Sequence, residues 1–247
     1  MTFELIRNTI GFIASLPFRL VPRRFRFRAV MKAGFLLAPL LGPTLRRRFE
    51  NTIWFAVGGP TDETLRVFFR AMVRMGLQHD PRIEADVDPE LLPALKAGGV
   101  VLVSAHFPLN AFFIRWLYDH GHEITAVRET PGRAFVWGTR TELDLLPPSP
   151  HHVMLQLRRK LVEGRPLVVI IDRARPSTRP LPIETRFGAT TIATPIFTLA
   201  EKLRVPVFFY GVRATKSGSA VLTVRRIPPD PAIFAEHFRR HTELMLP

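Results

Sequence analysis

Val100-Val101-Leu102-Val103-Ser104-Ala105-His106 is the stretch that decides the fold of this 247-residue chain. A continuous apolar run such as the one beginning at Val100 is typical of a strand that is buried on both faces of a parallel sheet. Comparable runs follow at residues 123–127, 167–171 and 205–210. Buried strands that alternate with helical patterns predict an α/β fold, with a mainly parallel sheet flanked by helices.

Helical patterns separate these runs, and glycines or prolines mark several of their ends. We expect helices over residues 64–76, 88–97, 112–118, 154–163, 195–203 and 232–245. Residues 220–227 are expected to form an edge strand. The domain prediction is a basic amphipathic helical segment over residues 1–50, followed by a single α/β domain over residues 51–247.

Composition narrows the classes of partner and of chemistry. The chain has 35 Lys and Arg against 21 Asp and Glu, a net charge of +14, and no cysteine. The lack of cysteine excludes disulfide scaffolds, thiolate metal sites and a cysteine nucleophile. The charge predicts a polyanionic partner: nucleic acid, an anionic membrane surface or an acidic protein.

Much of the charge lies in the first fifty residues, beside two short apolar runs over residues 10–16 and 30–43. Neither run reaches the roughly 20 apolar residues that a membrane-spanning helix needs. Eight arginines lie between residues 19 and 48, with phenylalanines interleaved among them. Short apolar helices with arginine-rich flanks favour an interfacial membrane anchor. Soluble core helices with solvated arginine faces, or a basic nucleic-acid-binding arm, are the alternatives.

Polar residues follow the predicted strands at their carboxyl ends, where open α/β sheets bind ligands. The first strand ends at His106, the second at Arg128 and Glu129, and the third at Asp172 and Arg173. An imidazole can accept a proton from an alcohol or amine that attacks a carbonyl carbon. His106 is therefore the candidate general base, and its alternative role is that of a core or capping histidine. Asp172 is either a functional carboxylate or a loop cap.

Basic residues and a helix start supply candidate anion sites. Arg128, Arg173 and Arg175 are candidates to bind phosphate, with solvated loop arginines as the alternative. Gly188 and Thr194 precede the predicted helix at residues 195–203, where a helix N-terminus can receive an anion; ordinary capping by Thr194 is the alternative. The sequence predicts no metal site and no cofactor, and it has no motif of the P-loop, dinucleotide-binding or hydrolase-elbow type.

Several segments, taken in chain order, resemble the lipid A late acyltransferase family of the lysophospholipid acyltransferase superfamily. They are Arg46-Arg47-Arg48-Phe49-Glu50-Asn51, Ser104-Ala105-His106-Phe107, Arg128 at a strand end, Glu163-Gly164 through Ile171-Asp172, Arg186-Phe187-Gly188-Ala189 through Pro195, and Val205-Pro206-Val207.

The resemblance implies transfer of a fatty acyl group from an acyl thioester to a hydroxyl or amine of a lipid or other amphiphile. The donor thioester would be carried by acyl carrier protein or coenzyme A, and His106 would be the general base. An acidic carrier protein fits the basic surface, and the expected location is the cytoplasmic face of a bacterial inner membrane. Asn110 and Phe107 join the expected substrate-binding residues, and an apolar groove is expected at Phe107, Phe112, Phe113 and Trp116.

One position departs from the family pattern. The family motif places an acid five residues after its histidine, and this chain has Ala111 there. Three explanations stay open: another carboxylate takes the role, with Glu129 preferred because it ends the strand expected to neighbour the one before His106, and Asp172 second; the alanine was engineered; or the chain is a non-catalytic relative that binds lipid or a carrier protein. Asn110 can hold the imidazole ring but does not stabilise its positive charge.

Overall fold

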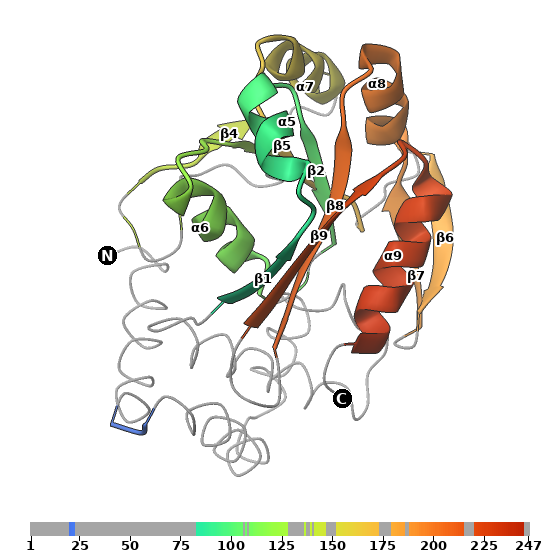
Figure 1. Cartoon of the computed structure of the whole chain (residues 1–247). Helices are drawn as coiled ribbons and strands as arrows, with labels where there is room; N and C mark the ends of the chain where they lie inside the picture. The colour runs from blue at the N-terminus through green and yellow to red at the C-terminus, as the bar shows by residue number, and fades with distance from the viewer. Residues whose placement is uncertain are drawn as a thin grey trace, which may run out of the picture.

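The computed structural model describes residues 20–22, 83–105, 107, 109–127, 136, 139, 141–146, 152–172, 179–185, 188–214 and 220–244. The basic segment predicted over residues 1–50 lies outside this part, apart from residues 20–22. So does the helix predicted over residues 64–76. The described part forms an α/β fold around a seven-stranded sheet (Figure 1).

The sheet has the strand order β1-β9-β8-β2-β5-β3-β4. Its strands are β1 (Ile83–Val87), β2 (Val101–Ser104), β3 (Thr125–Val127), β4 (Asp144–Leu146), β5 (Leu167–Ile170), β8 (Val207–Ala214) and β9 (Ala220–Ile227). Five neighbouring strands, β8, β2, β5, β3 and β4, run parallel to one another. β9 runs antiparallel to β8, and β1 runs parallel to β9. The prediction of a mainly parallel sheet is therefore confirmed.

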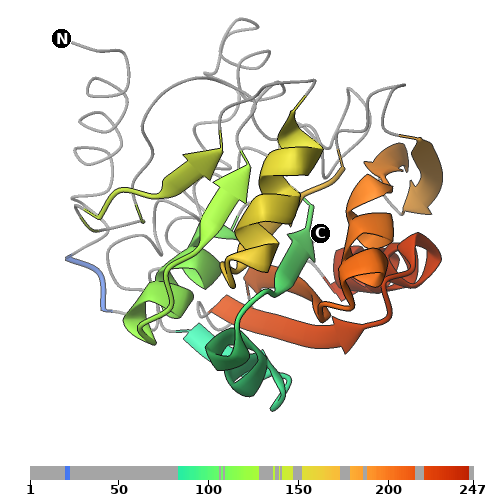
Figure 2. The ribbon, with the colours of Figure 1, turned by 90° about the horizontal axis from the view of Figure 1, so that it is seen from above.

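Helices cover both faces of this sheet, giving three layers. α5 (Leu91–Ala97) and α6 (Ala111–Asp119) pack on one face, through a cluster that includes Leu95, Phe113 and Tyr210. The other face carries α7 (Val153–Val162), α8 (Pro195–Leu203) and α9 (Pro231–Leu244). Figure 2 shows α7 in yellow and α8 in orange on the same side of the sheet. Alternate residues of the buried strands thus serve two different cores.

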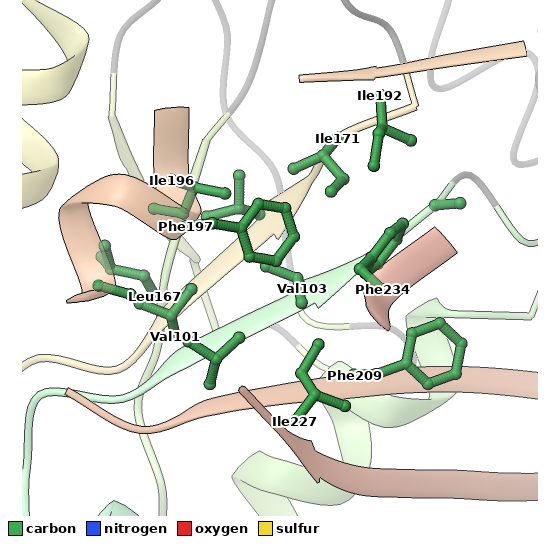
Figure 3. Close-up of a cluster of buried hydrophobic side chains, with 14 of the residues drawn as sticks. Val101, Val103, Leu167, Ile171, Ile192, Ile196, Phe197, Phe209, Ile227 and Phe234 are labelled. Carbon is green, nitrogen blue, oxygen red and sulfur yellow. The ribbon is translucent and has the colours of Figure 1, made fainter. Parts of the chain in front are cut away.

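The core under α8 and α9 is built from branched aliphatic and aromatic side chains. Val101, Val103 and Leu167 point from the sheet toward Phe197 and Phe234 of the covering helices (Figure 3). All five side chains are at most 1% exposed. β2 contributes Val101 and Val103 to this core and Leu102 to the opposite one, so both of its faces are buried. This burial is what the continuous apolar run predicted.

Tight turns at the amino ends of β2 and β5 place these two strands side by side. Gly99 has φ +68°, and a Cβ atom there would lie 3.0 Å from the carbonyl oxygen of Leu161. The Gly99 N–H also donates to the carbonyl oxygen of Gly164 at 3.0 Å. Both the positive φ and the close backbone approach require glycine at position 99.

Several strands differ from the sequence prediction. Residues 220–227 form β9, but β9 is not an edge strand, because β1 pairs with it. β1 and β4 were not predicted, since neither contains a continuous apolar run. A separate antiparallel hairpin of β6 (Pro180–Thr185) and β7 (Gly188–Ala193) was also missed.

Most predicted helices are confirmed within a few residues. α8 has the bounds that the sequence predicted, and α6, α7 and α9 begin one residue earlier than expected. α5 begins at Leu91, three residues after the expected start. Among the described residues, no helix is long and apolar enough to cross a lipid bilayer.

Candidate active site

The carboxyl edge of the five parallel strands is where the sequence placed the candidate site. β2 and β5 are hydrogen-bonded neighbours, with Ser104 opposite Ile170. The Ile171 N–H extends this pairing by donating to the Ser104 carbonyl oxygen at 3.0 Å. His106 comes two residues after Ser104 in the sequence, and Asp172 comes two residues after Ile170. The two segments that carry them therefore leave the sheet from adjacent strands at the same level.

Several predicted site residues fall outside the described part of the chain. They are His106, Arg128, Glu129, Arg173 and Arg175. The strand order nevertheless corrects one expectation, which placed Glu129 at the end of the strand neighbouring the one that precedes His106. β5 lies between β2 and β3, so β3, which precedes Glu129, is one strand further away. Neighbouring strands are about 4.8 Å apart, so β3 lies roughly 10 Å from β2.

Asp172 is the predicted carboxylate that the structure does describe, and it is 2% exposed. It lies two residues after the end of β5, and the residue between them, Ile171, accepts a hydrogen bond from the Ala193 N–H at 2.8 Å. Burial, followed by the negative charge of Asp172, raises the pKa of the Tyr210 phenol, which therefore keeps its proton at neutral pH. The negative charge of Asp172 therefore acts on the Tyr210 phenol, and both residues are buried.

Asn110 lies at the start of α6 but does not cap that helix with its side chain. Its Nδ2 amide instead donates backward, to Ser104 Oγ at 2.8 Å and to the Ala105 carbonyl oxygen at 2.7 Å. The Ser104 hydroxyl in turn donates to the Tyr210 carbonyl oxygen at 2.6 Å. This buried network ties the segment after β2 to α6 on one side and to β8 on the other.

Phe107 lies in the core, although the sequence predicted that it would line a substrate groove. Its ring is 4% exposed and packs on Phe238 and His241, with ring centroids 5.5 Å and 4.4 Å away. Phe112 and Phe113 are buried in the cluster on the opposite face of the sheet. Aromatic residues from the two faces do not meet in one groove, because the sheet itself lies between them.

His241 is a buried histidine that sequence reasoning did not single out. It is 3% exposed, and its ring covers Gly211 of β8. Burial, followed by the positive charge of Arg213, lowers the pKa of His241 to about 3, although a hydrogen bond with the Val212 backbone acts in the opposite direction. The ring is therefore neutral at physiological pH.

Gly188 and Thr194 do not come together at a helix N-terminus. Gly188 begins β7 and Thr194 follows the last residue of that strand, so an extended strand separates them by about 20 Å at 3.3 Å per residue. Thr194 makes no side-chain cap of α8, and its hydroxyl donates to the Arg179 carbonyl oxygen at 3.0 Å instead. The expected side-chain cap by Thr194 is therefore wrong, while the anion site at the start of α8 stays a prediction to which Gly188 lies too far away to contribute.

Two sequence signals point to the residues that were missed. Phe234, Phe238 and His241 repeat at helical spacing, a pattern that places His241 on the buried face of α9. Tyr210 ended the predicted strand at residues 205–210, next to the expected ligand edge. Ser104 and Asn110 carry no such signal for their mutual bond, because it depends on how α6 leaves β2.

No protein-family model matches the chain, and no curated protein matches it either. The acyltransferase resemblance accordingly rests on the sequence segments quoted above. Among the described residues, no group of three or more His, Asp or Glu side chains is placed to hold a metal ion.

Proposed function

We propose that this protein is an acyltransferase that moves a fatty acyl group from an acyl thioester to a lipid or another amphiphilic hydroxyl or amine. The donor is carried by acyl carrier protein or coenzyme A, and His106 is the general base. The observation that carries the proposal is the register of β2 and β5. It brings the segments that contain His106 and Asp172 out of adjacent strands at the ligand-binding edge of a parallel sheet.

The chemistry needs one proton acceptor and no covalent enzyme intermediate. His106 takes the proton of the acceptor hydroxyl or amine while that atom attacks the thioester carbonyl carbon. The tetrahedral intermediate then collapses, the carbon–sulfur bond breaks, and the imidazolium returns its proton to the departing thiolate. The sequence position that supplies an acid in the family is Ala111, the first residue of α6. A carboxylate elsewhere must therefore stabilise the imidazolium.

Asp172 is the better supported source of that negative charge. Its strand β5 is the direct neighbour of β2, whereas Glu129 follows β3, one strand further away. Asp172 is also buried at 2% exposure, and charges interact more strongly away from water. We therefore place Asp172 before Glu129 as the charge partner of His106, which reverses the order that the sequence favoured.

The second candidate function is a non-catalytic protein that binds a lipid or an acyl carrier protein. Ala111 favours it, because the first turn of α6 then carries no acid. The two candidates differ in one property, since only the acyltransferase forms a new ester or amide.

The test is acyl transfer from labelled acyl carrier protein or acyl coenzyme A into a lipid extract. His106→Ala is compared with His152→Ala, which alters an exposed histidine at the start of α7. Loss of a general base lowers turnover by about 10²–10⁴-fold, so only His106→Ala should fall by that much. Donor binding by the wild-type chain without any product would support the binding protein instead.

A further inference from the structure

A groove lies at the edge of the sheet opposite to the proposed active site. It has a volume of about 630 Å³ and lies between α5 and α8, where β8 begins and β9 ends. Both helices stand at this edge in Figure 1. Val207, which lines the groove, pairs with Val101, and Ser104 lies about 10 Å further along β2. The groove is therefore separate from the proposed active site, and its volume is typical of a pocket for one small ligand.

Most of the groove lining is apolar. It comes from both helices and from the chain beside the strand ends, and it includes Ala94, Ala200, Val205, Pro206, Pro228 and Pro229. Proline has no backbone N–H, so the three prolines add no main-chain donor to this surface. The Pro206 carbonyl oxygen already accepts the Val101 N–H at 3.0 Å. The lining therefore suits the apolar body of a ligand.

Four charged side chains also line the groove, and two of them pair with each other. Glu90 and Arg226 form an ion pair. Glu201 and Arg204 are exposed, and neither side chain has an ion-pair partner within the part of the chain that the structure describes. Residues three apart on a helix have Cβ atoms about 5–6 Å from each other. The rim thus offers one free negative and one free positive charge at a short spacing.

Both of these residues occupy positions that local preferences disfavour. Glu201 lies in the last turn of α8, where the partial negative charge of the helix end disfavours a carboxylate. Arg204 ends that helix in the left-handed region, with φ +54°, a position at which glycine is the usual residue. Such local conflicts are expected where function keeps a residue in place.

We propose that this groove is a ligand site, separate from the proposed active site, for a zwitterionic amphiphile with one short chain. The ammonium group pairs with Glu201, the anionic group pairs with Arg204, and the chain lies on the apolar lining. A ligand with a single charge would pair with one of the two side chains and lie beside a like charge on the other. The site does not depend on the proposed acyltransferase activity.

The test follows the Ala94 methyl group by NMR in the full chain labelled with ¹³C-methyl alanine. Its signal is assigned from its loss in Ala94→Ser, and the methyl group of Ala126, on β3 three strands from β8, is the internal reference. The probe is hexylphosphocholine, kept below its micelle concentration. We expect the Ala94 signal to shift saturably while the Ala126 signal stays in place. An Ala94 signal that does not shift overturns the proposal.

Three variants locate the two charges. Arg204→Gly removes the guanidinium but suits the positive φ, so its Tm should equal or exceed that of the wild type. Glu201→Gln removes the negative charge and keeps the side-chain size. Exposed ion pairs are weak, so each variant should raise the Kd for hexylphosphocholine by about 1.5–5-fold. Lys202→Gln alters an exposed charge of the same turn outside the groove lining and should leave the Kd unchanged. An equal rise in Lys202→Gln would indicate a nonspecific charge effect and overturn the assignment.

Further probes test the class of ligand. Hexyl phosphate and hexyltrimethylammonium carry one charge each and should bind more weakly than hexylphosphocholine. Each additional methylene group that is buried should tighten binding about four-fold, so heptylphosphocholine should bind more tightly. Equal affinity for a probe with one charge contradicts a zwitterion site. An Ala94 shift with phosphatidylcholine vesicles, but not with the monomeric probe, would make this edge a membrane contact and overturn the proposal.

Discussion

Replacing Gly211 by alanine tests how closely the His241 ring of α9 packs on β8. A Cβ atom at position 211 would lie 2.5 Å from Cε1 of His241, and 2.7 Å from both Nδ1 and Nε2. Favourable contacts between carbon atoms occur at about 3.5–4.0 Å, so the methyl group would overlap the ring by roughly 1 Å. The imidazole has little room to retreat, because its other neighbours include the rings of Phe107 and Phe209.

The expected loss of stability is the one typical of overpacked cores. Such insertions destabilise by about 1–3 kcal/mol. At roughly 2–4 °C per kcal/mol for a chain of this size, Gly211→Ala should lower Tm by about 2–12 °C. The assay is urea unfolding followed by circular dichroism, with Tm from a thermal scan as a second readout.

The effect of Gly211→Ala on stability should reverse when the His241 ring is removed. The three atoms nearest to the new methyl group all belong to the His241 ring, so His241→Ala removes the overlap with them. In the His241→Ala background, the protein with alanine at position 211 should be as stable as the protein with glycine, or more stable by about 0.5–1 kcal/mol. The reason is that glycine in a strand loses more conformational entropy on folding. If Gly211→Ala destabilises the His241→Ala protein as much as the wild type, the packing argument is refuted.

Three further predictions concern pH, charge and the N-terminal segment. Because the pKa of His241 is lowered to about 3, the unfolded chain binds more protons than the native one as pH falls below 6.5. The free energy of unfolding should therefore drop by about 2 kcal/mol between pH 7 and pH 5. In His241→Phe, urea midpoints should no longer show this part of the pH dependence. A pH dependence equal to that of the wild type would contradict the buried neutral ring. Asp172→Asn should reduce acyl transfer more than Glu129→Gln, and the reverse order would restore Glu129 as the partner of His106. A chain lacking residues 1–43 should no longer sediment with anionic vesicles, whereas continued binding would locate the membrane contact elsewhere.

Several helices and strands of this fold were predictable because their residue patterns favour one type of secondary structure. The run over residues 100–103 is apolar on both faces, which is the pattern of a buried strand. Pro195 at the start of α8 and the apolar spacing after it define that helix. β1 was not predictable in the same way, because only alternate residues of Ile83–Val87 are apolar and the strand is partly exposed.

Strand order is a property of long-range pairing, and the one expectation about the site that it contradicts is which strand neighbours the strand before His106. β5 inserts between β2 and β3 although it comes later in the chain, so the strand before Glu129 is not next to the strand before His106. The His241–Gly211 contact likewise joins α9 to β8 across the tertiary structure. Asn110 was noted in the sequence, but its unpartnered Oδ1 emerges only from the geometry of the turn before α6.

The central claim is that the carboxyl edge beside β2 and β5 transfers an acyl group with His106 as its base. The most direct measurement is the single-turnover rate of acyl transfer by wild type and His106→Ala, with the donor thioester saturating in both. We predict a rate lower by about 10²–10⁴-fold in His106→Ala, with donor affinity retained. Equal rates in the two proteins would contradict the claim.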